Sequence, residues 1–409
     1  MDEINPNKSI STVADNICVI IVLPSPPSNF SYSDWYLKEI CGIPFIMRNV
    51  LNLQRSGPNS LIIYSNENNA DLYKRLRDEK KVSIKLDWIS DVDEVIRSTK
   101  GCPVLVLSGG ALYTKQEIQS GINFAESNCG NPSKSFENKN MANILDQIVI
   151  KNEFLVSSSV GNLDSSIIFL PAMKDAWINR PKDFLDQQEK LLKDSGLDND
   201  SFLDKTVTRF FSRQLTRLFL KTSLSPNIIT FFSLAIGLIS AWHFFQGNYQ
   251  NILIGAGLIL LSAWVDCTDG EIARLKFLES EFGGKLDIIC DNLVHIAVFF
   301  AIGLGLYQST GESIFKLLGA FASFGALASF LLLSSSIINE KEKASEKKSG
   351  LKIKNNLTAK LANRDFVYLL SFMAVIGRVD VFILITAVGS NLFACYLIYS
   401  RLKSSLPTS

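Results

Sequence analysis

The sequence predicts a multi-pass α-helical membrane domain preceded by a cytosolic α/β domain. Up to about Leu220, short apolar runs alternate with polar stretches, as they do in α/β domains. After Pro226 the chain consists of long apolar segments with few charges, and its hydrophobic fraction of 47% is high for a soluble protein. We therefore expect an α/β domain at 1–179, a charged connector at 180–205 and a membrane domain at 206–409.

In the first domain, six strand-like runs alternate with four helix-like stretches, which is typical of a doubly wound sheet. The expected strands are Ile17–Leu23, Leu61–Tyr64, Val82–Leu86, Val104–Leu107, Phe154–Val156 and Ile167–Leu170. The expected helices lie near 44–56, 68–80, 91–99 and 114–126. The first residues, MDEINPNKS, are polar without an apolar core, so we expect no cleaved signal peptide and a cytosolic location for this domain.

About six segments of the second half are apolar enough to span a membrane. They are 227–246, 250–268, 286–307, 314–338, 365–379 and 381–400. The connections at 246–250 and 308–313 carry no Lys or Arg, whereas the 341–364 loop carries eight. Because Lys and Arg stay on the cytoplasmic side, we expect this loop, the 268–286 connection and the active site to face the cytosol at the cytoplasmic membrane.

A short amphipathic segment precedes the first span. Residues 206–221 have apolar side chains near helical spacing, and Arg209, Arg213 and Arg217 follow one another at intervals of four. On a helix these arginines form one cationic stripe. We expect an interfacial helix whose cations face anionic lipid.

Four aspartates flank the connection between the second and third spans. Asp266 and Asp269 are spaced i, i+3, and Asp287 and Asp291 are spaced i, i+4, so each pair shares one face of a helix. Ionisable groups at membrane depth are expensive and usually functional. Four close carboxylates would repel one another without a cation, and hard oxygen ligands suit one or two Mg²⁺ or Mn²⁺ ions. The alternative is a structural polar cluster in a transporter.

The overall composition argues against two other classes of ligand. Only two histidines are present, and the seven cysteines are scattered without a CxxC pair, so we expect no zinc site. Lys and Arg (41) nearly balance Asp and Glu (40), so we expect no nucleic-acid partner.

The pattern DxxDGxxAR, followed after eight residues by GxxxDxxxD, resembles the signature of the CDP-alcohol phosphotransferase (CDP-alcohol phosphatidyltransferase) family. The residues at the signature positions are Asp266, Asp269, Gly270, Ala273, Arg274, Gly283, Asp287 and Asp291. Ser225–Thr230 is similar to the PNxxT run of that family. With the preceding interfacial helix, the resemblance covers roughly 197–403.

The resemblance implies an enzyme of phospholipid or related polar-lipid biosynthesis. It would move a phosphoalcohol group from a CDP-alcohol to an acceptor hydroxyl and release CMP. It implies that Asp266, Asp269 and Asp287 ligate Mg²⁺ or Mn²⁺, and that Asp291, beside them or as a further ligand, takes the proton of the acceptor. It also implies a homodimer and a CDP site made of Asn227, Thr230, Asp269, Gly270, Ala273, Arg274 and Gly283.

The sequence does not identify the CDP-alcohol that serves as donor or the alcohol that serves as acceptor. The family uses CDP-diacylglycerol with glycerol phosphate, serine, inositol or inositol phosphate, and also CDP-choline or CDP-inositol. A phosphorylated acceptor needs cations near the metals. Lys360, Arg364 and Arg401 are candidates for this role, and their alternative role is positive-inside flanking.

Residues 41–65 and 104–118 resemble the sugar-phosphate nucleotidylyltransferase family, which also occurs fused ahead of CDP-alcohol phosphotransferases. Two features depart from that family. Proline-rich residues follow Leu23, where a Gly-rich phosphate loop belongs, and Ser108-Gly109-Gly110 stands where a metal-binding Asp belongs. We expect a degenerate, structural or regulatory domain. The alternatives are a bifunctional enzyme that makes its own CDP-alcohol from CTP, and a non-catalytic transporter or cation-binding protein.

Overall fold

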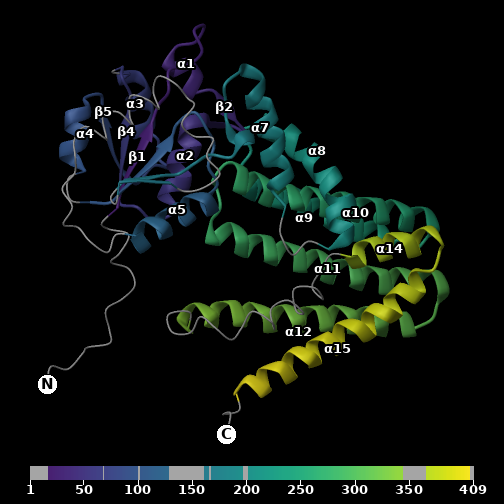
Figure 1. Cartoon of the computed structure of the whole chain (residues 1–409). Coiled ribbons are helices and arrows are strands. Elements are labelled where there is room, and N and C mark those ends of the chain that lie inside the picture. Colours follow the sequence, from purple (N-terminus) through teal and green to yellow (C-terminus); the bar gives the residue numbers. More distant parts are fainter. Residues whose placement is uncertain are drawn as a thin grey trace, which may run out of the picture. The chain divides into compact units, whose positions relative to one another are not determined.

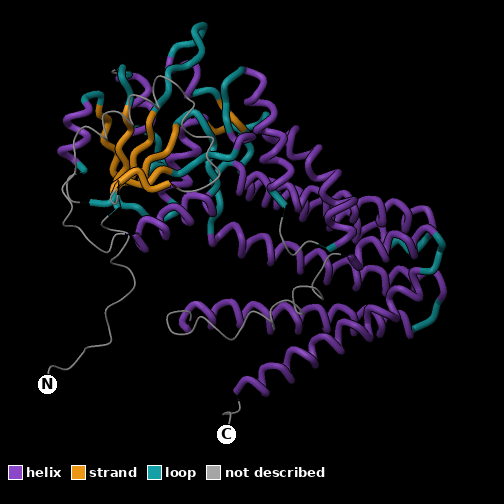
Figure 2. Tube along the Cα trace, in the orientation of Figure 1, coloured by secondary structure: helices purple, strands orange, loops and turns teal. Residues whose placement is uncertain are grey.

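The computed structural model describes residues 17–67, 69–99, 102–128, 161–164, 167–196, 201–343 and 365–405. The chain divides into two compact units, residues 1–190 and 191–409. The strands lie in the first unit, whereas the described part of the second unit consists of helices and short loops (Figure 2).

The first unit is built on a six-stranded sheet of order β5-β4-β1-β6-β8-β7. Figure 1 labels its strands β1, β4 and β5. All its strand pairs are parallel except β7 with β8. The strands are β1 Cys18–Val22, β4 Ser60–Tyr64, β5 Lys85–Ile89, β6 Val104–Ser108, β7 Gly161–Asp164 and β8 Ile167–Phe169. The central strands β1 and β6 are almost wholly apolar and buried, as expected of a parallel sheet covered on both faces.

Helices alternate with these strands, and the expected doubly wound α/β domain is confirmed. The helices are α1 Tyr32–Tyr36, α2 Phe45–Gln54, α3 Ala70–Arg77, α4 Val92–Ser98, α5 Lys115–Asn128 and α7 Pro181–Asp194, with the 3-10 turn η2 Lys174–Ala176. A two-stranded ribbon pairs β2 Glu39–Ile40 with β3 Ile43–Pro44. The strand expected at 154–156 lies outside the described residues.

One strand begins later than the sequence suggests, at Lys85 instead of Val82. The reason is a side chain from another element. The side-chain oxygen Oε1 of Gln54 accepts hydrogen bonds from the backbone N–H groups of Ser83 (2.7 Å) and Ile84 (3.2 Å). These bonds engage the two N–H groups before the strand starts.

Side chains pack closely around Gly109 and Gly110, at the carboxyl ends of β1 and β6. In α/β sheets this edge is where ligands usually bind. A Cβ added to Gly109 would lie 2.4 Å from a Leu23 methyl carbon, and one added to Gly110 would lie 3.1 Å from Pro24 and 3.4 Å from Trp177. The Gly110 N–H donates to the Ser108 hydroxyl (3.1 Å). These contacts engage the Gly110 backbone donor and leave little room for a side chain at either glycine.

The described part of the second unit contains five helices long and apolar enough to cross a membrane, so the chain is a multi-pass membrane protein. They are α9 Pro226–Phe245, α10 Tyr249–Leu275, α11 Glu281–Thr310, α12 Ile314–Lys343 and α15 Val379–Ser405. The π-helical turn η3 Asp204–Thr208 and α8 Arg209–Leu220 precede them.

The segment expected as a span at 365–379 is shorter within the described residues. It forms α14 Asp365–Val375, which has 11 residues. Gly377 adopts a left-handed φ of +70°, and the Arg378 N–H donates back to the Met373 carbonyl at 2.8 Å. This cap is centred on Gly377, two residues past Val375, and it prevents the helix from continuing.

Small residues let the membrane helices approach closely. A Cβ added to Gly305 of α11 would lie 2.1 Å from the Phe244 carbonyl oxygen, and one added to Gly303 would lie 2.6 Å from the Gly319 Cα. Membrane helices commonly pack in this way, with small residues that let the backbones of two helices approach closely. This packing places α11 against both α9 and α12.

Candidate functional site

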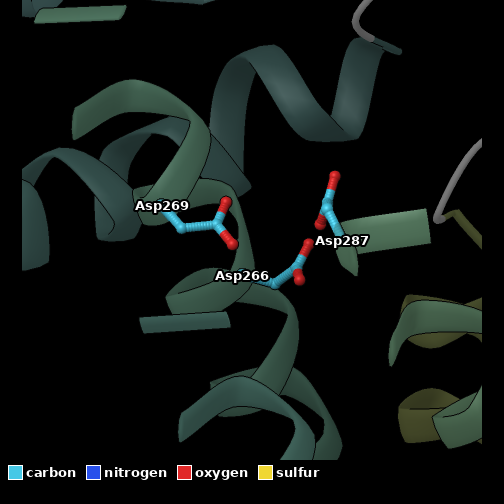
Figure 3. A group of neighbouring side chains, drawn as sticks. All are labelled: Asp266, Asp269 and Asp287. Carbon is cyan, nitrogen blue, oxygen red and sulfur yellow. The ribbon is translucent and has the colours of Figure 1, made fainter. Parts of the chain in front are cut away.

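Three carboxylates converge where α10 ends and α11 begins. Asp266 and Asp269 lie on α10 and Asp287 lies on α11, with their side chains pointing toward one another (Figure 3). One oxygen of each falls within 4.8 Å of the others. Asp266 is 3% exposed and Asp269 is 6% exposed, while Asp287 is half-buried. We call these three residues the carboxylate cluster.

A short loop between the two helices brings these aspartates together. Phe277, just past the end of α10, has a left-handed φ of +56°, and the next N–H, of Leu278, donates to the Ala273 carbonyl at 2.8 Å. Ser280 then caps α11, because its hydroxyl accepts the Gly283 N–H at 3.0 Å. The chain thus turns from the end of one carboxylate-bearing helix to the start of the next within five residues.

Two hydroxyls of α9 hold the α10 carboxylates. Thr230 donates to Asp269 and also contacts the Pro226 carbonyl, and Ser233 donates to Asp266 at 3.3 Å. Thr230 is buried, so its hydroxyl donates to Asp269 in the interior of the protein and not at the surface. Sequence reasoning placed Thr230 in the CDP site and did not identify Ser233, for which no local pattern gives a signal.

The carboxylate cluster fits a divalent cation. Carboxylate oxygens are hard ligands of the kind that Mg²⁺ and Mn²⁺ take, and outer hydroxyl donors orient such ligands in metal sites. Two of the three side chains are almost fully buried, where uncompensated negative charge is costly. Asp291, one helical turn after Asp287, is outside this group of three.

A pocket of about 190 Å³ adjoins the cluster. It brings together all seven residues expected to bind CDP: Asn227, Thr230, Asp269, Gly270, Ala273, Arg274 and Gly283. Its lining also includes residues that sequence reasoning missed, namely Pro226, Leu278, Glu279, Ser280 and Gly284. Most of these missed residues belong to the loop between the helices, whose course a local motif does not specify.

The glycines of this pocket leave room that a side chain would fill. A Cβ on Gly270 would lie 3.2 Å from Arg274 Nη1, and a Cβ on Gly283 would lie 3.1 Å from Asn227 Oδ1. Arg274 also donates from Nε to the Ser195 carbonyl at 2.9 Å. This bond orients the guanidinium, whose other end stays beside Gly270 at the pocket wall.

Arg209, the first arginine of the stripe on α8, does not face lipid as expected. Arg209 is buried, and its Nη1 donates to the equally buried Glu271 at 2.7 Å. Arg213 and Arg217 are half-buried, and Arg213 donates to the Lys193 carbonyl at 3.1 Å. The expectation was wrong because helical spacing tells which residues share a face but not which way that face points.

Of the expected acceptor-binding residues, Lys360 and Arg364 lie outside the described residues, as does the side chain of Arg401.

Three known proteins are similar to parts of this chain. An archaetidylinositol phosphate synthase from Pyrococcus horikoshii is 29% identical over 98 residues, which make up 24% of this chain and 50% of the relative. A bifunctional IPC transferase and DIPP synthase from Archaeoglobus fulgidus is 30% identical over 122 residues, which make up 30% of this chain and 24% of the relative. The crystal structure of phosphatidylinositol phosphate synthase from Mycobacterium tuberculosis with CDP-DAG bound covers 49% of this chain and 99% of its own, at 16% identity and a TM-score of 0.35.

The chain spans about half, or less, of the length of the curated relatives it matches. The resemblance of residues 1–179 to nucleotidylyltransferases stays a prediction. Residues 223–396 match the family described as CDP-alcohol phosphatidyltransferase, and this range holds the carboxylate cluster and the whole pocket beside it. Residues 223–396 of this chain are therefore similar to the CDP-alcohol phosphatidyltransferase family.

Proposed function

We propose that this protein transfers a phosphoalcohol group from a CDP-alcohol to the hydroxyl of an acceptor and releases CMP. The observation that carries the proposal is the carboxylate cluster beside a pocket lined by all seven expected nucleotide-binding residues. The pocket offers glycines for close approach of a base or ribose and an arginine for a phosphate.

Each residue of the site has its own role in this reaction. Asp266, Asp269 and Asp287 hold Mg²⁺ or Mn²⁺, which when bound neutralises charge on the diphosphate and on departing CMP. The acceptor oxygen attacks the phosphorus that carries the alcohol, and the bond from that phosphorus to the CMP oxygen breaks. Asp291, one turn along α11 from Asp287, accepts the proton that the acceptor hydroxyl loses. Arg274 and Asn227 orient the bound nucleotide.

The test is CMP release by the detergent-purified chain, with a panel of CDP-alcohols and acceptors, with and without Mg²⁺. The name of the Pyrococcus relative makes inositol phosphate the first acceptor to assay. We expect metal-dependent CMP that vanishes in Asp291→Asn and persists in Asp380→Asn, whose ion pair with Arg378 is exposed and belongs to another helix. Absence of CMP with every donor would overturn the proposal.

A second candidate is a bifunctional enzyme that also makes its CDP-alcohol from CTP. It is favoured by relatives such as the Archaeoglobus protein, which is named as a bifunctional enzyme. The packing of the first unit argues against it, because Leu23, Pro24 and Trp177 lie close to Gly109 and Gly110 at the edge of the sheet where ligands usually bind. Pyrophosphate release from CTP by the full chain carrying Asp291→Asn would establish this second activity, and its absence would remove it.

We also propose that the site faces the cytosol at the cytoplasmic membrane, since eight Lys and Arg residues fall in the 341–364 loop. Protease accessibility of that loop in inside-out and right-side-out vesicles tests this orientation. The homodimer implied by the family resemblance is tested by light scattering of the purified protein in detergent.

A further inference from the structure

A buried carboxylate behind the site binds the helix that precedes the spans. Glu271 of α10 is fully buried. Its Oε1 accepts hydrogen bonds from Arg209 Nη1 and Ser212 Oγ, each at 2.7 Å, and its Oε2 accepts one from Thr216 Oγ1 at 2.6 Å. All three donors lie on one face of α8. We call this set of four residues the Glu271 clamp.

The clamp and the carboxylate cluster lie on opposite sides of the same helical turn. Glu271 follows Asp269 by two residues, which places it about 200° around the helix axis. From the other side, Thr230 and Ser233 of α9 hold Asp269 and Asp266. This stretch of α10 is therefore bonded directionally from both sides, by α9 at the front and by α8 at the back.

Stability alone does not explain an ion pair at this place. Burying two charges is costly, and apolar residues of similar volume often serve a fold as well or better. What directional bonds add is a defined rotation of one helix against another, which apolar packing specifies less sharply.

Rotation matters at a metal site. A carboxylate oxygen lies roughly 5–6 Å from a helix axis, so turning α10 by about 10° moves it by about 1 Å. Metal–ligand distances tolerate only about 0.2 Å. Small rotations of α10 would therefore change the separation between Asp266 or Asp269 and their partner on α11, Asp287.

We propose that Glu271 is a positioning residue for the metal site. By bonding α8 over two turns, it sets the rotation of α10 at which Asp266 and Asp269 face Asp287. This role rests on the proposed function, because it presumes that the cluster binds a divalent cation.

Direct binding of Mn²⁺ to the purified full chain, followed by electron paramagnetic resonance without substrate, tests the role. Glu271→Gln keeps the shape of the side chain but weakens the bonds to Arg209. We expect its Mn²⁺ dissociation constant to rise about 10- to 100-fold, as when outer partners of metal ligands are changed. Its CMP release is expected to recover at high Mn²⁺. Asp380→Asn, which breaks an exposed ion pair, is the matched control and is expected to bind Mn²⁺ like the native chain.

A double variant separates positioning from charge neutralisation. Arg209→Met with Glu271→Met removes both buried charges of the Glu271 clamp and keeps the volume filled, so the thermal midpoint should stay near the native value. We expect Mn²⁺ binding to remain weakened, because the directional bonds are gone. Native affinity in this folded double variant would overturn the positioning role. Absence of Mn²⁺ binding by the native chain would instead overturn the proposed function itself.

Discussion

The hydroxyl of Thr230 gives the sharpest test of how the site is organised. Thr230 is 2% exposed and donates to Asp269, which is 6% exposed, so no bulk water can replace this hydrogen bond. Thr230→Val puts a methyl group in place of the hydroxyl and changes little else in the shape of the side chain. The Asp269 carboxylate then loses the donor that orients it.

The size of the effect follows from the charge of the acceptor. A hydrogen bond to a charged group contributes about 1.5–3 kcal/mol, more than a neutral one. At about 1.4 kcal/mol for each factor of ten, its loss corresponds to roughly 10- to 150-fold. We therefore expect Thr230→Val to weaken Mn²⁺ binding by about 10- to 100-fold, the range found for outer partners of metal ligands.

The assay is Mn²⁺ binding in the absence of nucleotide, together with kcat and KM for the CDP-alcohol. Thr268→Val is the matched control, since Thr268 is equally buried on α10 but donates to the Trp264 carbonyl at 2.9 Å. Unchanged Mn²⁺ affinity in Thr230→Val, with a raised KM for the donor, would refute the reasoning. It would show that this hydroxyl serves the nucleotide instead.

Three further predictions concern packing, titration and metal removal. Gly305→Ala should lower the thermal midpoint, because its Cβ would lie 2.1 Å from the Phe244 carbonyl oxygen and overpacking costs about 1–3 kcal/mol; Gly257→Ala, whose Cβ meets nothing within 4 Å, should not. Burial, and then Cys102, raises the pKa of the Cys18 thiol to about 11. Iodoacetamide at pH 8 should therefore alkylate Cys18 roughly a hundredfold more slowly than an unperturbed cysteine, and an ordinary rate by mass spectrometry would contradict this. EDTA should abolish CMP release and added Mg²⁺ should restore it, whereas release that persists in EDTA would argue against metal dependence.

Local periodicity predicted that Asp266 and Asp269 share one helix face, but it also paired Asp291 with Asp287, and Asp291 lies outside the carboxylate cluster. Asp266 and Asp269 are one turn apart on a continuous helix, so helix geometry alone puts them on one face. Asp287 follows in the first turns of the next helix. Hydropathy likewise predicted the five long spans, since each is a continuous apolar segment.

Such local patterns do not predict contacts between segments that are far apart in the sequence. Arg209 and Glu271 are 62 residues apart in the chain, and nothing near either of them signals the other. Within the signature, Glu271 occupies a position that the pattern leaves open. Ser233 and Glu279 lie beside the site because helices and a loop pack there, which depends on the whole membrane unit.

The end of α14 shows that hydropathy alone does not predict where a helix ends. The apolar run through Ile376 reads as part of a span, yet the helix has already ended at Val375. The cause is Gly377, which accepts a left-handed backbone that other residues avoid. A single glycine thus outweighs the hydropathy of the residues around it.

The pair formed by Arg209 and Glu271 also bears on how this protein is made. A ribosome releases α8 before α10, so the cation exists before the carboxylate that it neutralises. A lone charged glutamate that enters the bilayer during synthesis is costly, and such residues usually pair with another group. The nascent second span can therefore insert against a waiting partner, before the third span brings the last aspartate of the cluster.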